Sequence, residues 1–238
     1  MIRYFFLFAL FFLSKTNGQT LTGPQLLEKA IAHHDPNGAW GTFKGKLSIT
    51  MQTPDNSDRI SDIILDLPLQ YFSLTIKKDS TIIEQTVHKN ECELALNGST
   101  IISEEDIKTH RLTCERTKIL KDYYTYLYGL PMKLKDPGTF IDSKIYPKHF
   151  RGKDYLAIKV KYEKEVGKDT WYFYFDPTTY AMEVYQFFHD ESKNDGEFII
   201  LNGIEEINGI KIPKTRAWYY NKNNKYLGTD ILTESSSF

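Results

Sequence analysis

Short segments in which apolar and polar residues alternate make up most of this sequence. Between Phe43 and Met51, for example, apolar or small residues alternate strictly with polar ones. A period of two is typical of a β-strand with one buried face, and turn residues or charges separate each segment from the next. We expect strands at 43–51, 58–67, 69–77, 80–88, 91–97, 139–146, 154–163, 169–176, 180–188, 196–201, 204–207, 210–220 and 225–233. This spacing predicts an antiparallel meander of on the order of eleven strands.

Two regions break the alternation and are expected to be helical. Residues 22–34 place apolar side chains at helical spacing, and Pro24 suits the first turn of a helix. The second region, 103–129, begins with Ser103 and Asp106 at the spacing of a capping box. Its apolar residues keep helical spacing, so we expect one helix there or two short ones.

A loop of fixed shape is expected at residues 130–138, between the second helical region and the next strand. It mixes apolar side chains with Pro131 and Pro137. Two interpretations remain open: a loop lying across the mouth of a cavity, or a rigid connector.

These elements predict an α+β fold with one domain at residues 19–238. A twisted antiparallel sheet of about ten strands tends to curl. We therefore expect a long, strongly curved sheet, a half-barrel, covered by one or two helical segments. An apolar hollow between sheet and helices would be a natural ligand cavity.

The first eighteen residues have the features of a secretory signal peptide. Arg3 precedes ten apolar residues, and the small residues Thr16 and Gly18 precede Gln19. We expect cleavage between Gly18 and Gln19, although an uncleaved membrane anchor remains an alternative. No cysteine precedes Cys92, so a lipid-modified N-terminal cysteine is not expected. The sequence thus predicts a soluble periplasmic or secreted protein without a transmembrane anchor.

The charge balance of the predicted mature chain disfavours nucleic acid as a partner. Without the predicted signal peptide, 28 basic residues stand against 31 acidic ones, a net charge of −3. Phosphate binding needs clustered positive charge, which a nearly neutral chain does not indicate.

Cys92 and Cys114 are the only cysteines. An oxidising compartment favours a disulfide between them, which would stabilise the fold by roughly 3 kcal/mol. Two separate buried thiols are the alternative. We expect no metal site, because two cysteines without a histidine at ligand spacing make half a site at best.

No motif of nucleophilic, metal-dependent or phosphate-binding catalysis occurs in the sequence, and we expect no cofactor. His33, His34 and Asp35 stand together at the end of the first predicted helix. Capping and packing explain them most simply, since a histidine there interacts well with the helix dipole. A hydrolase or isomerase that uses His34 with Asp35 remains the less favoured hypothesis.

Aromatic residues fill both faces of two predicted strands, at 171–175 and 218–220. Such strands are core more often than pocket, but a sheet with few helices cannot cover both faces along its whole length. A bound apolar ligand could cover the remainder, with Arg216 and Lys133 near a polar head group. The residues expected to bind the ligand are Phe43, Leu47, Ile49, Met132, Lys133, Trp171, Phe173, Arg216 and Trp218.

Four stretches carry a resemblance to a known family: His34-Asp35-Pro36 before Trp40, Leu130 to Thr139, Gly167 to Tyr172, and Arg216 to Tyr219 followed by Leu227 to Asp230. Together they resemble a family of exported bacterial envelope proteins of the Bacteroidetes type whose function is unknown. The order of strands and helices is also similar to that of the LolA/LppX-like lipoprotein-carrier superfamily. That resemblance implies a half-barrel that holds acyl chains under its helices, and it implies no catalytic residues.

The leading functional hypothesis is therefore an exported protein that binds an apolar or acylated molecule on the concave face of its sheet. The alternative is a protein–protein interaction module of the cell envelope. In that case the protein's own side chains would fill the hollow, and the loop at 130–138 would contact the partner protein.

Overall fold

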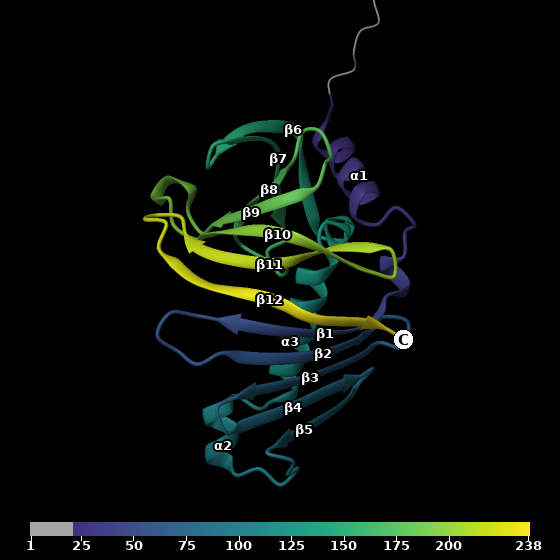
Figure 1. Cartoon of the computed structure of the whole chain (residues 1–238), viewed down its shortest axis with the longest axis vertical. Helices are drawn as coiled ribbons and strands as arrows, with labels where there is room; N and C mark the ends of the chain where they lie inside the picture. Colours follow the sequence, from purple (N-terminus) through teal and green to yellow (C-terminus); the bar gives the residue numbers. More distant parts are fainter. Residues whose placement is uncertain (1–20) are drawn as a thin grey trace, which may run out of the picture.

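The computed structural model describes residues 21–238. The predicted signal peptide and its cleavage site lie outside these residues. The described chain forms one antiparallel sheet of twelve strands, with helices on one of its faces (Figure 1).

The sheet consists of two meanders joined side by side. Its strand order is β5-β4-β3-β2-β1-β12-β11-β10-β9-β8-β7-β6, so only the β1–β12 pair joins strands that are distant in sequence. The strands are β1 (Lys44–Gln52), β2 (Arg59–Asp66), β3 (Tyr71–Lys78), β4 (Thr81–His88), β5 (Glu91–Leu96), β6 (Thr139–Phe150), β7 (Lys153–Tyr162), β8 (Thr170–Phe175), β9 (Met182–Phe188), β10 (Glu197–Ile207), β11 (Ile210–Tyr220) and β12 (Tyr226–Ser237).

The α+β class and the antiparallel meander are confirmed, and two details differ from the expectation. The sheet has twelve strands: of the thirteen segments expected to be strands, those at 196–201 and 204–207 form a single strand, β10. Gly203 lies between them with a φ of 67°, a conformation that glycine adopts without strain and that allows the strand to continue. Within the described chain, β5 and β6 each have a neighbour on one side only, so the sheet is open and lacks the strong curl that we expected.

The helices begin at side-chain caps. In α1 (Gly23–His34), Thr22 and Gln25 form a capping box. The region expected to be one or two helices is two: α2 (Glu104–His110), capped by Ser103, and α3 (Cys114–Gly129), capped by Thr113. Three short 3₁₀ helices complete the fold: η1 (Trp40–Thr42), η2 (Met132–Lys135) and η3 (Glu191–Lys193).

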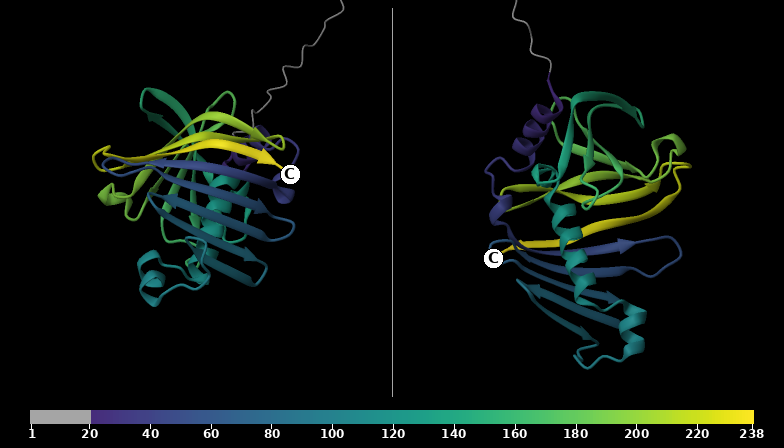
Figure 2. Two further views of the ribbon diagram at one scale, coloured as in Figure 1. Left: turned by 60° about the horizontal axis from the view of Figure 1, so that its bottom comes forward. Right: turned by 180° about the vertical axis from the view of Figure 1, so that it is seen from behind.

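Helix α3 runs across one face of the sheet (Figure 2). A disulfide joins Cys114, the first residue of α3, to Cys92 in β5, with 5.9 Å between their Cα atoms. The Thr117 hydroxyl donates a hydrogen bond of 2.9 Å to the side-chain oxygen of Gln85 in β4. The N-terminal end of α3 is thus fixed to the β4–β5 side of the sheet.

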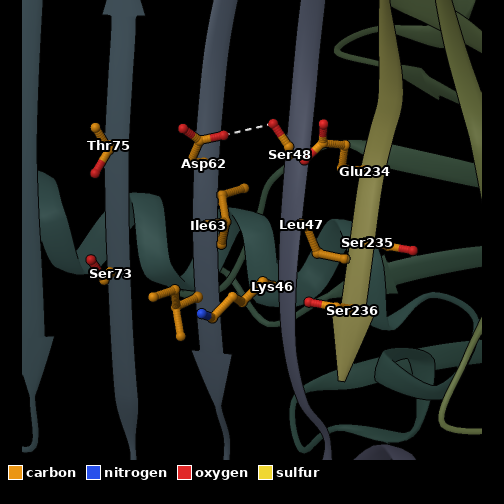
Figure 3. Close-up of a pocket in the computed structure, with 11 residues that line it drawn as sticks. Lys46, Leu47, Ser48, Asp62, Ile63, Ser73, Thr75, Glu234, Ser235 and Ser236 are labelled. Carbon is orange, nitrogen blue, oxygen red and sulfur yellow. Dashed lines mark hydrogen bonds between the residues drawn. The ribbon is translucent and has the colours of Figure 1, made fainter. Parts of the chain in front are cut away.

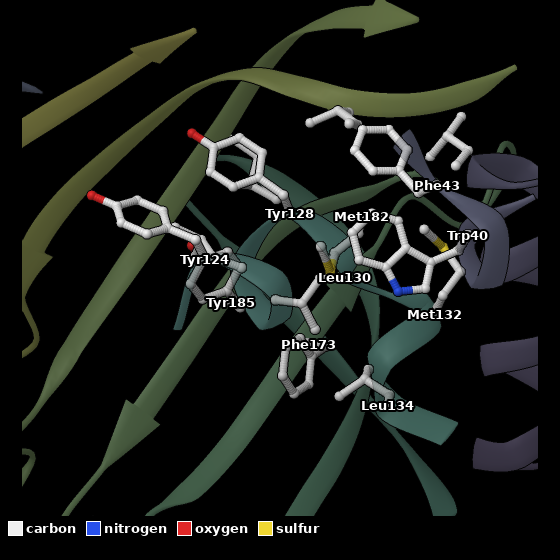
Figure 4. Packing of buried hydrophobic residues seen from close by; sticks show 14 of the residues in the cluster. Trp40, Phe43, Tyr124, Tyr128, Leu130, Met132, Leu134, Phe173, Met182 and Tyr185 are labelled. Atoms are coloured by element: carbon white, nitrogen blue, oxygen red, sulfur yellow. The ribbon is translucent and has the colours of Figure 1, made fainter. Parts of the chain in front are cut away.

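The main hydrophobic core lies between the sheet and helices α1 and α3 (Figure 4). Trp40 stacks on Phe43 with ring centroids 5.1 Å apart. A Cβ atom on Gly129 would lie 2.4 Å from the Trp40 ring, so only glycine allows α3 to approach this indole so closely. We call this end of the central strands, where β1 begins, the Trp40 end.

The segment 130–138 is largely part of this core. Leu130, Met132 and Leu134 are buried, and only residues 135–137 are exposed. The rigid-connector interpretation therefore describes residues 130–134, and the docking hypothesis loses most of the surface that it needs.

Candidate functional site: two hollows beside helix α3

At the opposite end of the central strands, where β11 turns into β12, the face under α3 is incompletely filled. We call this end the Trp218 end. A hollow of about 230 Å³, the Trp218 hollow, lies there between α3 and the sheet. It is lined by Met51, Arg59, Tyr123, Glu197, Trp218, Leu227, Gly228 and Asp230.

A larger opening of about 640 Å³, the side cleft, lies between α3, the segment after η2, and the β7–β8 hairpin. It is lined by Ile119, Asp122, Tyr123, Thr125, Tyr126, Lys133, Asp136, Tyr162, Glu165, Val166, Gly167, Asp169 and Trp171. Tyr123 lines both openings, so the side cleft and the Trp218 hollow are neighbours along one helix.

Aromatic side chains form the wall of the side cleft. Trp171 packs on Phe187 with ring centroids 4.7 Å apart, and the hydroxyls of Tyr126 and Tyr162 share a hydrogen bond. Burial raises the pKa of Tyr162 to about 12, so this hydroxyl stays protonated near neutral pH. On α3, Ile119 and Tyr123 are 56% and 43% exposed although both are large and apolar. Exposed apolar surface beside a concave opening is typical of a ligand site.

The charges around the side cleft are mostly negative. Lys133 forms an ion pair with Asp136, so its ammonium group already has a partner. Three further carboxylates line the cleft, those of Asp122, Glu165 and Asp169. The cleft therefore offers an apolar wall with an acidic rim, and the predicted ligand contact of Lys133 remains a prediction.

A row of polar and apolar side chains lies on the sheet beneath the Trp218 hollow. Four successive cross-strand neighbours run through β2, β1, β12 and β11: Arg59, Met51, Asp230 and Arg216. Burial raises the pKa of Asp230, and the positive charges of Arg216 and Arg59 oppose that shift. Burial also raises the pKa of Glu197.

Arg216 lies beneath this hollow and is only 1% exposed. Its guanidinium carbon is 4.1 Å from the centroid of the Tyr128 ring on α3. Two of its nitrogens donate long hydrogen bonds, of 3.3 Å to the Leu127 carbonyl and 3.4 Å to the Pro213 carbonyl. The contacts of this guanidinium group are thus one stacking contact and two hydrogen bonds to backbone carbonyls.

The structure divides the predicted ligand-binding residues into two groups. Five lie in the core, where the protein's own side chains surround them: Phe43, Leu47, Ile49, Met132 and Phe173. The other four lie at or beneath the two openings: Lys133 and Trp171 at the side cleft, Trp218 at the hollow, and Arg216 below it.

The sequence analysis missed the tyrosines of the site, Tyr123, Tyr126 and Tyr162. Ile119 and Tyr123 are among the residues at helical spacing in the region 103–129, but both are exposed. The signal that could have found them is the number of large apolar residues on α3, which exceeds what a single buried stripe needs.

His34 and Asp35 hold the backbone and are not arranged for catalysis. The His34 Nδ1 atom lies 2.8 Å from the Lys211 carbonyl oxygen, and Nε2 accepts a hydrogen bond from the Met182 N–H at 2.9 Å. A carbonyl only accepts and an amide only donates, so the ring is neutral with its proton on Nδ1. Burial lowers the pKa of His34 to about 4. The Asp35 carboxylate accepts from the N–H groups of Ala39 and Trp40 at 2.7 and 2.9 Å.

The opposite face of the sheet carries a polar groove of about 420 Å³ over β1, β2, β3 and β12 (Figure 3). Small polar side chains make this groove, and the Ser48 hydroxyl donates to Asp62 at 2.6 Å. Lys77 forms an ion pair of 2.8 Å with the same carboxylate. Because these polar groups satisfy one another, this groove is a weaker candidate than the two openings beside α3.

Within residues 21–238, no helix is long and apolar enough to cross a membrane. In the same part of the chain, no three His, Cys, Asp or Glu side chains are grouped closely enough to hold a metal ion.

Three solved structures are similar to this chain in fold. A putative outer membrane lipoprotein-sorting protein domain from Vibrio parahaemolyticus has a TM-score of 0.51 at 10% identity, with 90% of this chain and 91% of that chain covered. A DUF1329 family protein from Desulfovibrio piger has a TM-score of 0.51 at 6% identity, covering 90% and 92%. A LolA superfamily protein from Nitrosomonas europaea has a TM-score of 0.49 at 10% identity, covering 91% and 94%.

At such low identities these likenesses describe the fold alone. No curated protein matches the sequence significantly. The model of one protein family, described as a family of unknown function (DUF6503), matches residues 2–235, nearly the whole chain. The chain therefore belongs to the DUF6503 family, and its fold is similar to that of the lipoprotein-sorting protein domain and of the DUF1329 family protein.

Proposed function

We propose that this protein is exported and binds the apolar chain of an acylated molecule in the side cleft. The observation that carries the proposal is the cleft itself, with about 640 Å³ between Ile119 and Tyr123 on α3 and Trp171 on β8. Sites for small molecules typically measure about 300–1,000 Å³ and have mostly apolar walls. The likeness in fold to a putative outer membrane lipoprotein-sorting protein domain supports this role.

Burial of an alkyl chain supplies enough free energy for useful binding. Each buried methylene contributes about 0.8 kcal/mol. A sixteen-carbon chain that is half covered would thus gain about 6 kcal/mol, which corresponds to a Kd in the tens of micromolar. Chain burial alone then explains reversible binding, as a carrier or sensor requires.

Two independent features support export. The first eighteen residues have the composition of a signal peptide. The Cys92–Cys114 disulfide forms and persists in oxidising compartments such as the periplasm. We infer a periplasmic or secreted protein that is cleaved after Gly18.

A substitution at Gly167 tests the proposal most cleanly. A Cβ atom there would meet Tyr162 at 3.6 Å, an ordinary contact distance, and Gly167 lines the cleft. Gly167→Phe should fill the cleft without straining the backbone. The matched control is Gly41→Phe, because Gly41 has open space around its Cβ position and lies outside the cleft.

The measurement is native mass spectrometry of protein purified from the periplasm, followed by lipid extraction. We expect a stoichiometric acyl-containing adduct on the parent protein and on Gly41→Phe, and at least about tenfold lower occupancy on Gly167→Phe. Equal occupancy in Gly167→Phe would place the ligand elsewhere. A clean mass for the parent protein that also fails to take up added monopalmitoylglycerol would refute the proposed function.

A further inference from the structure

Several buried polar atoms at the Trp218 end make no hydrogen bond to any group of residues 21–238. Four of them lie under α3 around Asp230: Nε of Arg59, Nε of Arg216, and the hydroxyls of Tyr128 and Tyr185. Tyr128 and Tyr185 are 1% and 2% exposed, and Arg216 is 1% exposed. We call this group of side chains the polar chamber.

The polar chamber adjoins the Trp218 hollow. Arg59 and Asp230 line the hollow, and Arg216 is the direct cross-strand neighbour of Asp230. The ring of Tyr185 contacts Trp218 edge-on, with centroids 6.3 Å apart. Figure 4 shows the hydroxyl of Tyr128 pointing away from Trp40.

Aromatic side chains of the polar chamber also pack against those of the two openings. The Tyr185 ring lies 6.2 Å from that of Trp171, which lines the cleft, and 6.3 Å from that of Trp218. Tyr123 borders both openings from the side of α3. A ligand with its chain in the side cleft could therefore place its polar end at the chamber.

The unpartnered atoms of the polar chamber determine which polar group of a ligand can bind there. An arginine Nε–H can only donate, and a tyrosine hydroxyl can donate, so the chamber requires a hydrogen-bond acceptor. Leaving such donors buried without a partner is costly, and each therefore favours a ligand oxygen.

The charges determine that the acceptor is neutral. Two guanidinium groups, of Arg59 and Arg216, are matched by two carboxyl groups, of Asp230 and Glu197. A carboxylate or ammonium group brought into this balanced site would be a buried charge without a counterion, which is unfavourable. The acidic rim of the side cleft disfavours an anionic ligand further.

We propose that the polar chamber recognises the carbonyl oxygen of an ester or amide, so that the ligand is a neutral acyl ester or acyl amide. This inference rests on the proposed function, because the acyl chain must occupy the side cleft for its carbonyl group to reach the chamber. It excludes free fatty acids and long-chain amines as preferred ligands.

The test compares four sixteen-carbon probes by their displacement of a fluorescent apolar dye: methyl palmitate, palmitic acid, hexadecylamine and hexadecane. We expect methyl palmitate to bind at least about tenfold more tightly than the other three, since a hydrogen bond to a charged donor gives at least that factor. Failure of all four to displace the dye would refute the proposed function itself. Equal affinities of the four probes would be consistent with the proposed function but would overturn the inference. Water would then be the occupant of the polar chamber. Tightest binding of palmitic acid or hexadecylamine would also overturn it.

Tyr185→Phe provides an internal check, because it removes a hydroxyl that has no partner within residues 21–238. The variant should fold with undiminished stability, while its preference for methyl palmitate over hexadecane falls about fivefold or more. The matched control is Tyr155→Phe, which removes a hydroxyl bonded to Glu183 outside the main core and should leave the preference unchanged. An unchanged preference in Tyr185→Phe would show that the chamber does not recognise the head group.

Discussion

The Trp40 end and the Trp218 end of the central strands lie under the same helix and on the same face of the sheet, yet only one is filled. At the Trp40 end, the indole of Trp40 stacks on Phe43 and lies against Gly129 of α3. At the Trp218 end, Tyr123 borders two openings, and charged groups lie beneath the helix.

This difference shows that helix coverage alone does not decide whether a sheet face is core or binding site. Side-chain identity decides it. Apolar rings at the Trp40 end have only each other as favourable partners, so they close the space between helix and sheet. Arginine and aspartate at the Trp218 end keep polar atoms that need partners and resist dry packing.

The largest expected effect is a difference in the free energy of unfolding between variants of Trp40 and of Trp218. Trp40→Ala should lower the free energy of unfolding by about 3–5 kcal/mol, because it leaves a large cavity in a filled core. Trp218→Ala should lower it by only about 1–2 kcal/mol, since this side chain already borders a hollow. Denaturant unfolding of both variants measures the difference, and equal losses would show that the two ends are packed alike.

The next largest expected effect is a fall in the free energy of unfolding at acidic pH, and it comes from His34. His34 is neutral when folded, with a pKa lowered to about 4 from 6.5, so its contribution to stability is complete above pH 6.5 and is lost as the pH falls toward 4. Between pH 7 and pH 5 the free energy of unfolding should fall by about 2 kcal/mol through this residue.

His34→Gln is the control for that pH dependence. The variant is less stable at pH 7, because it disturbs the bonds to Lys211 and Met182. Its loss between pH 7 and pH 5 should nevertheless be about 2 kcal/mol smaller than that of the parent protein. Parallel pH profiles for the two proteins would contradict the assignment of a neutral, buried His34.

The smallest expected effect on stability compares two residues of α3 itself. Ile119→Ala, at the side cleft, should change the free energy of unfolding by no more than about 0.5 kcal/mol. Leu127→Ala, in the core, should lower it by about 2–5 kcal/mol. Ligand affinity should show the opposite order, falling for Ile119→Ala and not for a folded Leu127→Ala. A large destabilisation by Ile119→Ala would mean that the cleft wall is part of the core.

Much of the fold could be predicted because its signals are local. Alternation of residue types predicted the strands, and Ser103 marked the start of the second helical region, where the structure begins α2. The separate strands expected on either side of Gly203 were wrong, because a single glycine with positive φ lets β10 continue through it. The degree of curl depends on the twist summed over twelve strands, which no local pattern contains.

The site was harder to predict, because it depends on which buried faces are left unfilled. Phe43 and Trp171 are both aromatic and both pack into the main core cluster, and nothing in their sequence spacing distinguishes core from cleft. What distinguishes them is α3, whose Gly129 lies against Trp40 beside Phe43, whereas Trp171 lies across a cleft from Tyr123. Arg216 was predicted to lie near a polar head group, and that placement remains a prediction.

The most direct test of the central claim, that the openings beside α3 hold an acyl chain, is photo-crosslinking with a palmitoyl ester that carries a diazirine on its chain. Peptide mapping by mass spectrometry should find the label on Ile119–Tyr126 and Tyr162–Trp171, the segments that line the side cleft. Labelling confined to the polar groove of the opposite face, or to the Trp40 end, would contradict the claim.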